Sequence, residues 1–91
     1  MNPTIVNNSN NKRFETTVDG MTAYIRYEPF EWGLDLVSTY VPVELRGQRI
    51  GADLARYACE YAKDHHLKLI PSCHFIKVYL RRHPEYQSLE V

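Results

Sequence analysis

Residues 39–51 read Thr39-Tyr40-Val41-Pro42-Val43-Glu44-Leu45-Arg46-Gly47-Gln48-Arg49-Ile50-Gly51, and this stretch decides the fold. It predicts the end of a strand, a tight turn, and the first turn of a long helix that begins near Gln48. Exposed backbone N–H groups at a helix N-terminus, together with the positive end of the helix dipole, can bind an anion. Gly47 lets a ligand approach the backbone closely, and Arg46 adds a permanent cation. The stretch therefore predicts a pocket for a phosphate-bearing molecule. Plain turn formation by the two glycines is the alternative.

Upstream of this stretch, the sequence predicts a meander of three antiparallel strands. Residues 12–18 and 21–27 alternate in polarity, and the intervening Asp19-Gly20 is a strong hairpin signal. Residues 28–33 form a connection that contains Pro29, and residues 34–41 are rich in strand formers. Residues 1–11 are rich in asparagine and offer little to bury. They predict a flexible arm ahead of one domain over residues 12–91.

Downstream, the pattern changes to helical spacing. An amphipathic helix is expected over residues 48–65, followed by a short apolar strand over residues 67–70. A strand–helix–strand unit of this length fits a right-handed crossover, so the short strand should pair in parallel with the third strand. Ser72 is the expected N-cap of a second helix over residues 74–82, which ends at His83-Pro84. The fold class is α/β.

Composition excludes several classes of protein. Lysine plus arginine and aspartate plus glutamate both number 11, so the chain lacks the basic excess of a general nucleic-acid or anionic-membrane binder. No apolar run approaches a membrane span, and no secretory signal is visible. Two cysteines are too few for a disulfide scaffold, and with the histidines they show no zinc-site spacing. These features predict a cytoplasmic protein without a metal site.

Four segments in order carry a family resemblance. They are Val41-Pro42, Gly47-Gln48-Arg49-Ile50-Gly51, Pro71-Ser72-Cys73 and Arg82-His83-Pro84-Glu85-Tyr86. Over Phe14 to Leu89 the chain resembles the small single-domain members of the GNAT superfamily of acyl-CoA N-acyltransferases. The resemblance implies a minimal GNAT-like fold and an acetyl-CoA-dependent N-acetyltransferase whose amine acceptor, a small molecule or a protein, is unidentified. The alternative is a module that binds coenzyme A, acetyl-CoA or a protein without turnover.

The resemblance also implies roles for individual residues. The pyrophosphate of coenzyme A would be held by the turn and helix start, and the pantetheine arm would lie beside the strand that ends at Val41. Tyr79 would face the leaving thiolate and Cys73 would lie near the thioester; the alternative for Cys73 is a packing residue, and the resemblance favours the first role. Arg82 would contact a phosphate, or else complement the dipole at the end of its helix. The residues assigned to the cofactor are thus Val41, Arg46, Gly47, Gln48, Arg49, Ile50, Gly51 and Arg82.

The chain departs from the family pattern at several places. Arg49 stands where the superfamily usually has a glycine, and Ser38 and Tyr40 stand where the subgroup often has histidine and glutamate. Two early helices and the last two strands of the full fold are missing. Because those parts usually build the acceptor side, the amine site would be open, or a second copy would complete it in a homo-oligomer.

Overall fold

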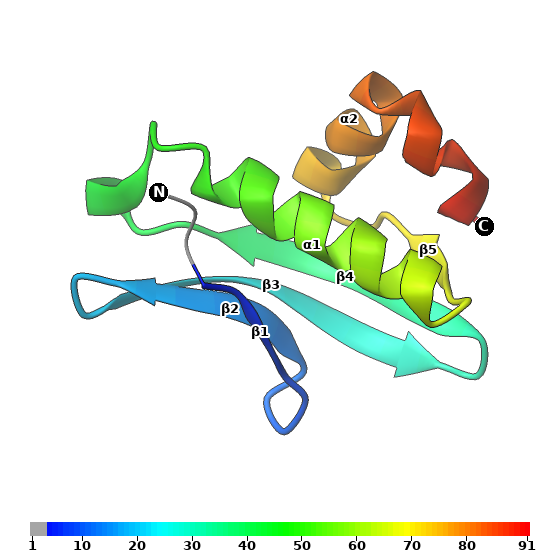
Figure 1. Cartoon of the computed structure of the whole chain (residues 1–91), viewed down its shortest axis with the longest axis horizontal. Coiled ribbons are helices and arrows are strands. Elements are labelled where there is room, and N and C mark those ends of the chain that lie inside the picture. The colour runs from blue at the N-terminus through cyan, green and yellow to red at the C-terminus, as the bar shows by residue number, and fades with distance from the viewer. Residues whose placement is uncertain (1–3) are drawn as a thin grey trace.

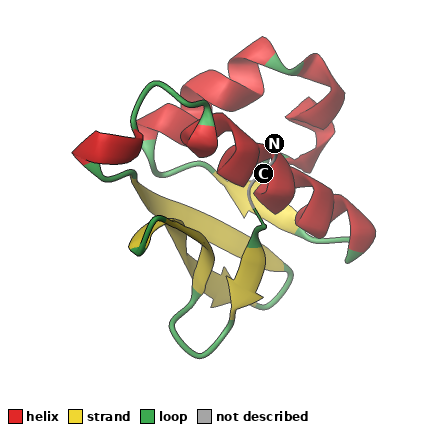
Figure 2. Ribbon diagram, turned by 60° about the vertical axis from the view of Figure 1, so that its left-hand side comes forward, coloured by secondary structure: helices red, strands yellow, loops and turns green. Residues whose placement is uncertain are grey.

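A computed structural model describes residues 4–91, which form a five-stranded sheet with helices packed on one face (Figure 1). The strands lie in sequence order, β1-β2-β3-β4-β5; neighbours among the first four are antiparallel, and β5 is parallel to β4. Figure 2 shows the two layers, with the strands on one side and the helices on the other. The elements are β1 (Val6–Asn8), β2 (Arg13–Val18), β3 (Met21–Phe30), β4 (Gly33–Tyr40), the 3-10 segment η1 (Val43–Leu45), α1 (Ile50–Asp64), β5 (Lys68–Ile70), α2 (His74–Arg82) and the 3-10 segment η2 (Pro84–Leu89).

The sheet has one more antiparallel strand than the sequence predicts. Val6–Asn8 pairs with β2, and the Asn7 side chain accepts a hydrogen bond of 2.7 Å from the Tyr27 hydroxyl. The prediction of a flexible arm is therefore wrong for residues 6–8. Backbone pairing holds this segment, and backbone pairing leaves little trace in side-chain polarity. Residues 1–3 of the predicted arm lie outside the described residues.

The hairpin between β2 and β3 is confirmed, because Asp19 and Gly20 have φ values of 52° and 77°. The next connection is shorter than predicted: β3 continues to Phe30 and pairs with β4 from Gly33 onward. Gly33 is required there, since a Cβ atom on it would lie 2.3 Å from the Lys68 carbonyl oxygen. In β4, Val37 has no partner on β3, which makes it the extra residue of a β-bulge.

The core lies between the sheet and the two helices. Its largest fully buried side chains come from strands, helices and η1 alike: Phe14, Ile25, Leu36, Leu45, Leu54, Leu69, Ile76 and Leu80. The predicted crossover from β4 through α1 to β5 is confirmed by their parallel pairing. The bounds of α2 are also as predicted, but its N-cap is Cys73 in place of Ser72. None of the helices between residues 4 and 91 has the length and apolarity needed to cross a membrane.

Candidate functional site

The end of β4 has an open edge. β5 pairs only with Gly33–Asp35, and the Cys73 N–H then donates to the Leu36 carbonyl at 2.9 Å. β4 continues to Tyr40. Apart from the pairing with β3, the backbone of residues 37–40 forms no hydrogen bond with the backbone of any described residue, so the other edge of β4 is open here. An extended ligand with amide groups could pair with such an edge in the way that a strand does.

The N-terminus of α1 begins where this edge ends. The helix starts at Ile50, two residues later than predicted, because Arg49 takes a left-handed conformation (φ 65°, ψ 18°) and acts as its N-cap. Within residues 4–91, the backbone N–H groups of residues 47–52 have no hydrogen-bond acceptor. Gly47, with φ 83°, lets the chain turn into these positions. The result is a row of free donors at the positive end of the helix dipole.

A cavity of about 340 Å³ lies at this helix start. The Arg46 Nε atom donates a hydrogen bond of 2.9 Å to the Val41 carbonyl, which holds the guanidinium at the cavity. None of the described residues that line the cavity is acidic, so its two arginines leave it cationic. Six of the eight residues that the sequence assigns to the cofactor line it: Val41, Arg46, Gly47, Arg49, Ile50 and Gly51. Gln48 is exposed beside the cavity and is not part of its wall.

Sequence reasoning missed Phe75, which also lines the cavity. Its side chain is 40% exposed, and a Cβ atom on Gly51 would lie 3.2 Å from its Cζ atom. Gly51 therefore lets Phe75 of α2 rest directly on the first turn of α1. An aromatic residue at an exposed helix position was the available signal, but it became visible only once the two helices were placed together.

Cys73 lies at the open edge of β4. Its Sγ atom is 3.5 Å from the Thr39 hydroxyl oxygen, and its side chain is partly exposed. Thr39 pairs with Ile25, which is fully buried, so Thr39 lies on the helix side of the sheet. The structure thus joins Cys73 to the strand whose edge leads to the cavity.

Tyr79 and Arg82 lie elsewhere on α2. Tyr79 is only 8% exposed, and its ring stacks on His83 at a centroid distance of 4.0 Å. Burial, with the nearby Cys59 and Glu85, raises the pKa of Tyr79 to about 12, so the phenol stays protonated at neutral pH. Arg82 is exposed in the last turn, seven residues beyond Phe75 or about 10 Å along the helix axis. Neither residue lines the cavity at the start of α1.

Comparison with protein-family models places the chain among known proteins. The model described as GCN5-related N-acetyl-transferase matches residues 13–89. The matched range begins at β2 and includes β4, both helices, the cavity at the start of α1 and Cys73.

Proposed function

The chain belongs to the GCN5-related N-acetyltransferase family, and we propose that it transfers an acetyl group from acetyl-CoA to an amine. One observation carries the proposal: the open edge of β4 leads directly into a cationic cavity at the N-terminus of α1. A ligand with a diphosphate at one end and an amide-containing arm at the other fits this arrangement, with the diphosphate in the cavity and the arm along the edge of β4.

The residues around the cavity fit a diphosphate. The free N–H groups of residues 47–52 would donate to its oxygens, and the arginines at 46 and 49 would neutralise its charge. Phe75, with Val41, offers apolar contact to the adjoining arm. The arm would continue along β4 toward Thr39 and Cys73.

Bound acetyl-CoA would supply the thioester from which the amine takes its acetyl group. On the protein side, backbone N–H groups at the open edge of β4 can stabilise negative charge on the carbonyl oxygen. Thr39 and Cys73 would line the acyl end and exclude water. The Tyr79 phenol retains its proton at neutral pH. The thiolate of a thiol with the ordinary pKa of about 8.5 is a much weaker base than the Tyr79 phenolate, so Tyr79 would not transfer its proton to the leaving thiolate. Tyr79 can therefore act only as a hydrogen-bond donor.

The test of binding uses Ala52→Asp. Ala52 lies in the first turn of α1 and lines the cavity, so an aspartate there suits the helix dipole but repels a diphosphate. Calorimetry with acetyl-CoA should show binding to the wild-type chain and a loss of at least about tenfold in the variant, a change of about 1.4 kcal/mol. Ala52 also packs against the core, so thermal unfolding should confirm that the variant is folded at the temperature of the binding measurement. Asn10→Asp, in the exposed turn after β1, adds the same charge away from the cavity and should bind normally. Equal affinity in all three proteins would remove the site assignment.

The test of turnover uses the same wild-type protein with acetyl-CoA and a panel of primary amines. Release of free thiol that depends on both the amine and the protein supports acetyl transfer. Tight binding of acetyl-CoA without such release would favour the second function, a binding module that does not catalyse transfer.

A further inference from the structure

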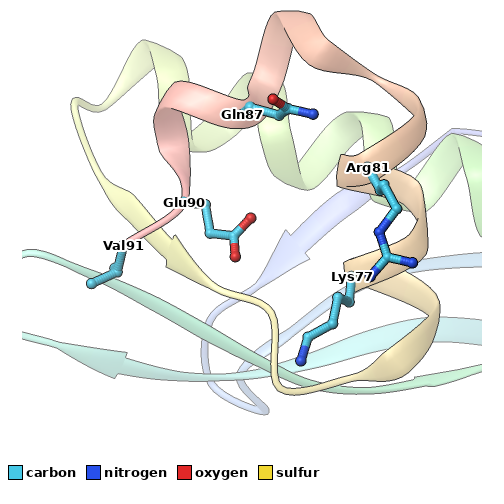
Figure 3. Close-up of a pocket in the computed structure, with 5 residues that line it drawn as sticks. All are labelled: Lys77, Arg81, Gln87, Glu90 and Val91. Atoms are coloured by element: carbon cyan, nitrogen blue, oxygen red, sulfur yellow. The ribbon is translucent and has the colours of Figure 1, made fainter.

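A second cavity, of about 590 Å³, lies on the side of α2 that faces away from Phe75 and the first cavity. It is lined by Lys77 and Arg81 of α2, Gln87 of η2, and Glu90 and Val91 (Figure 3). The last two residues are held beside β5, because Glu90 bridges to Leu69 and the Val91 N–H donates to the Leu69 carbonyl at 3.0 Å. The cavity is therefore built between α2 and the C-terminal stretch that β5 holds in place.

The walls of this cavity carry charges of both signs. Lys77 and Arg81 project from one wall, and the carboxylate of Glu90 comes from the facing wall (Figure 3). Among residues 4–91, none of these three side chains forms an ion pair. Gln87 adds an amide that can both donate and accept a hydrogen bond. This set matches a ligand group that is itself both anionic and cationic.

The two cationic residues of this cavity lie in line with Cys73 on α2. Residues four apart lie on the same side of a helix, so Cys73, Lys77 and Arg81 form one row on α2. Lys77 is about 6 Å and Arg81 about 12 Å from Cys73 along the helix axis. Phe75 lies two residues from Lys77 and so points to the other side, toward Gly51 of α1. The two cavities thus lie on different sides of α2, and the row that carries Lys77 and Arg81 leads back to Cys73.

We propose that this second cavity binds the amino-acid end of the acceptor, which is a free α,ω-diamino acid. Its α-carboxylate is held by Lys77 and Arg81, and its α-ammonium group is held by Glu90. A side chain of three or four methylene groups would then extend along this row toward Cys73 and present the ω-amine at the open edge of β4. This inference rests on the proposed acetyl transfer. In that step the ω-nitrogen forms a bond to the acetyl carbon, the carbon–sulfur bond breaks, and one amine proton ends on the sulfur.

The first experiment compares three amines of similar length in the acetyl-transfer assay. L-Ornithine carries both α-groups, δ-aminovalerate carries only the carboxylate, and putrescine has no carboxylate. We expect kcat/KM to fall in that order, with ornithine acetylated on its δ-nitrogen. Equal kcat/KM for ornithine and putrescine in the wild-type chain would overturn the proposal.

Substitutions in the second cavity test whether the preference among the three amines arises there. The double variant K77Q/R81Q should lower kcat/KM for ornithine by at least about tenfold and leave that for putrescine unchanged. E90Q should lower kcat/KM for ornithine but not for δ-aminovalerate. The matched control is R56Q/K63Q, which removes the same charge from exposed positions of α1 and should behave like the wild type. A loss shared equally by all three amines would overturn the proposal.

The second experiment needs no acetyl-CoA. Amide NMR spectra of labelled wild-type protein should show saturable shifts at residues 77, 81, 87 and 90 on addition of ornithine. The shifts should disappear in K77Q/R81Q and persist in R56Q/K63Q. Specific shifts without any acetyl transfer would support the cavity and count against the proposed reaction. Transfer without shifts at these residues would leave the reaction standing and overturn the cavity.

Discussion

The hydroxyl oxygen of Thr39 and the Sγ atom of Cys73 lie 3.5 Å apart. Thr39 is near the end of β4, and Cys73 is the N-cap of α2, so this side-chain contact joins the two elements beside the edge that β5 leaves unpaired. The only other cysteine is buried inside the helix layer. The two thiols therefore meet different surroundings, and their reactivities should differ.

Cys73 should react with alkylating reagents before Cys59 does. Cys59 is 0% exposed, and burial raises the pKa of its thiol to about 12, with Glu60 and Glu85 adding to the shift. Cys73 is partly exposed at the open edge. Limiting iodoacetamide followed by peptide mass spectrometry should find the label on Cys73, and coenzyme A should slow the labelling. Earlier labelling of Cys59, or no protection by coenzyme A, would show that Cys73 is not at the acyl end.

Cys73 should line the acyl end without carrying the acetyl group. Its Sγ atom has one hydrogen-bonding contact among the described side chains, the Thr39 hydroxyl, and no histidine or carboxylate of residues 4–91 hydrogen-bonds to it. Cys73→Ala should therefore keep most of the transfer rate. A kinetically competent acetyl adduct on Cys73, seen by mass spectrometry after mixing with acetyl-CoA, would contradict this expectation.

Replacing Arg49 with glycine should stabilise the protein. Arg49 sits at φ 65°, where a residue with a Cβ atom costs about 1–2 kcal/mol and glycine does not. Part of that gain is lost to the greater freedom of glycine in the unfolded chain, so urea denaturation should show an increase of about 1 kcal/mol or less. Arg49→Ala removes the same cation but keeps the Cβ atom, and should not stabilise.

The same substitution tests the role of the arginine side chain in binding. Arg49 is exposed, so its loss should change the free energy of coenzyme A binding by less than about 1 kcal/mol. A large gain in affinity in Arg49→Gly would mean that the arginine obstructs the cavity.

Gly47 and Gly20 form a matched pair for separating strain from ligand contact. Their φ values are 83° and 77°, and an added Cβ atom would meet nothing within 4 Å at either position. Valine at either site should lower the free energy of unfolding by a similar amount, about 1–2 kcal/mol. Only Gly47→Val should also weaken coenzyme A binding, by about tenfold or more, because only Gly47 lines the cavity. Equal affinities in the two variants would show that the ligand does not approach Gly47.

Much of the fold could be predicted because it leaves marks in side-chain polarity. The Asp19-Gly20 hairpin, the apolar stripe of α1 and the bounds of α2 all rest on local patterns. β1 leaves no such mark, since its residues 6–8 are held by backbone pairing. Pro29 suggested a loop, yet it lies in β3 beyond Arg26, the last β3 residue that pairs with β2. That part of β3 needs no donor on its free side, so proline is tolerated.

In the candidate site too, some features follow from local sequence and others depend on how the helices pack. The turn at Gly47 and the helix start follow from local sequence, and six of the residues that the family resemblance assigns to the cofactor line one cavity. Phe75 could not be assigned, because its contact with Gly51 depends on how two helices pack. The position of Tyr79 against His83 likewise follows from the packing of α2 and η2.

Stability should fall as the pH rises above about 9. Three buried groups between α1, α2 and η2 lose their protons late: burial raises the pKa of Cys59 from 9.0 to about 12 and that of Tyr79 from 10.0 to about 12, and burial with Glu60 raises that of Tyr86 further. Between the ordinary and the raised pKa values, the unfolded chain has released these protons while the folded chain still holds them. The folded state then binds more protons, so raising the pH favours unfolding.

Urea denaturation at several pH values between about 8 and about 11 measures this dependence as a falling midpoint. Tyr86→Phe removes one of the three groups together with its 2.5 Å hydrogen bond to Glu60. The variant should be less stable at pH 8 but should lose stability less steeply as the pH rises. Tyr40→Phe, which removes a phenol that is 47% exposed, should keep the wild-type slope. A midpoint that stays constant through this range would show that water reaches the three groups in the folded protein, and that η2 does not stay packed over α1 and α2.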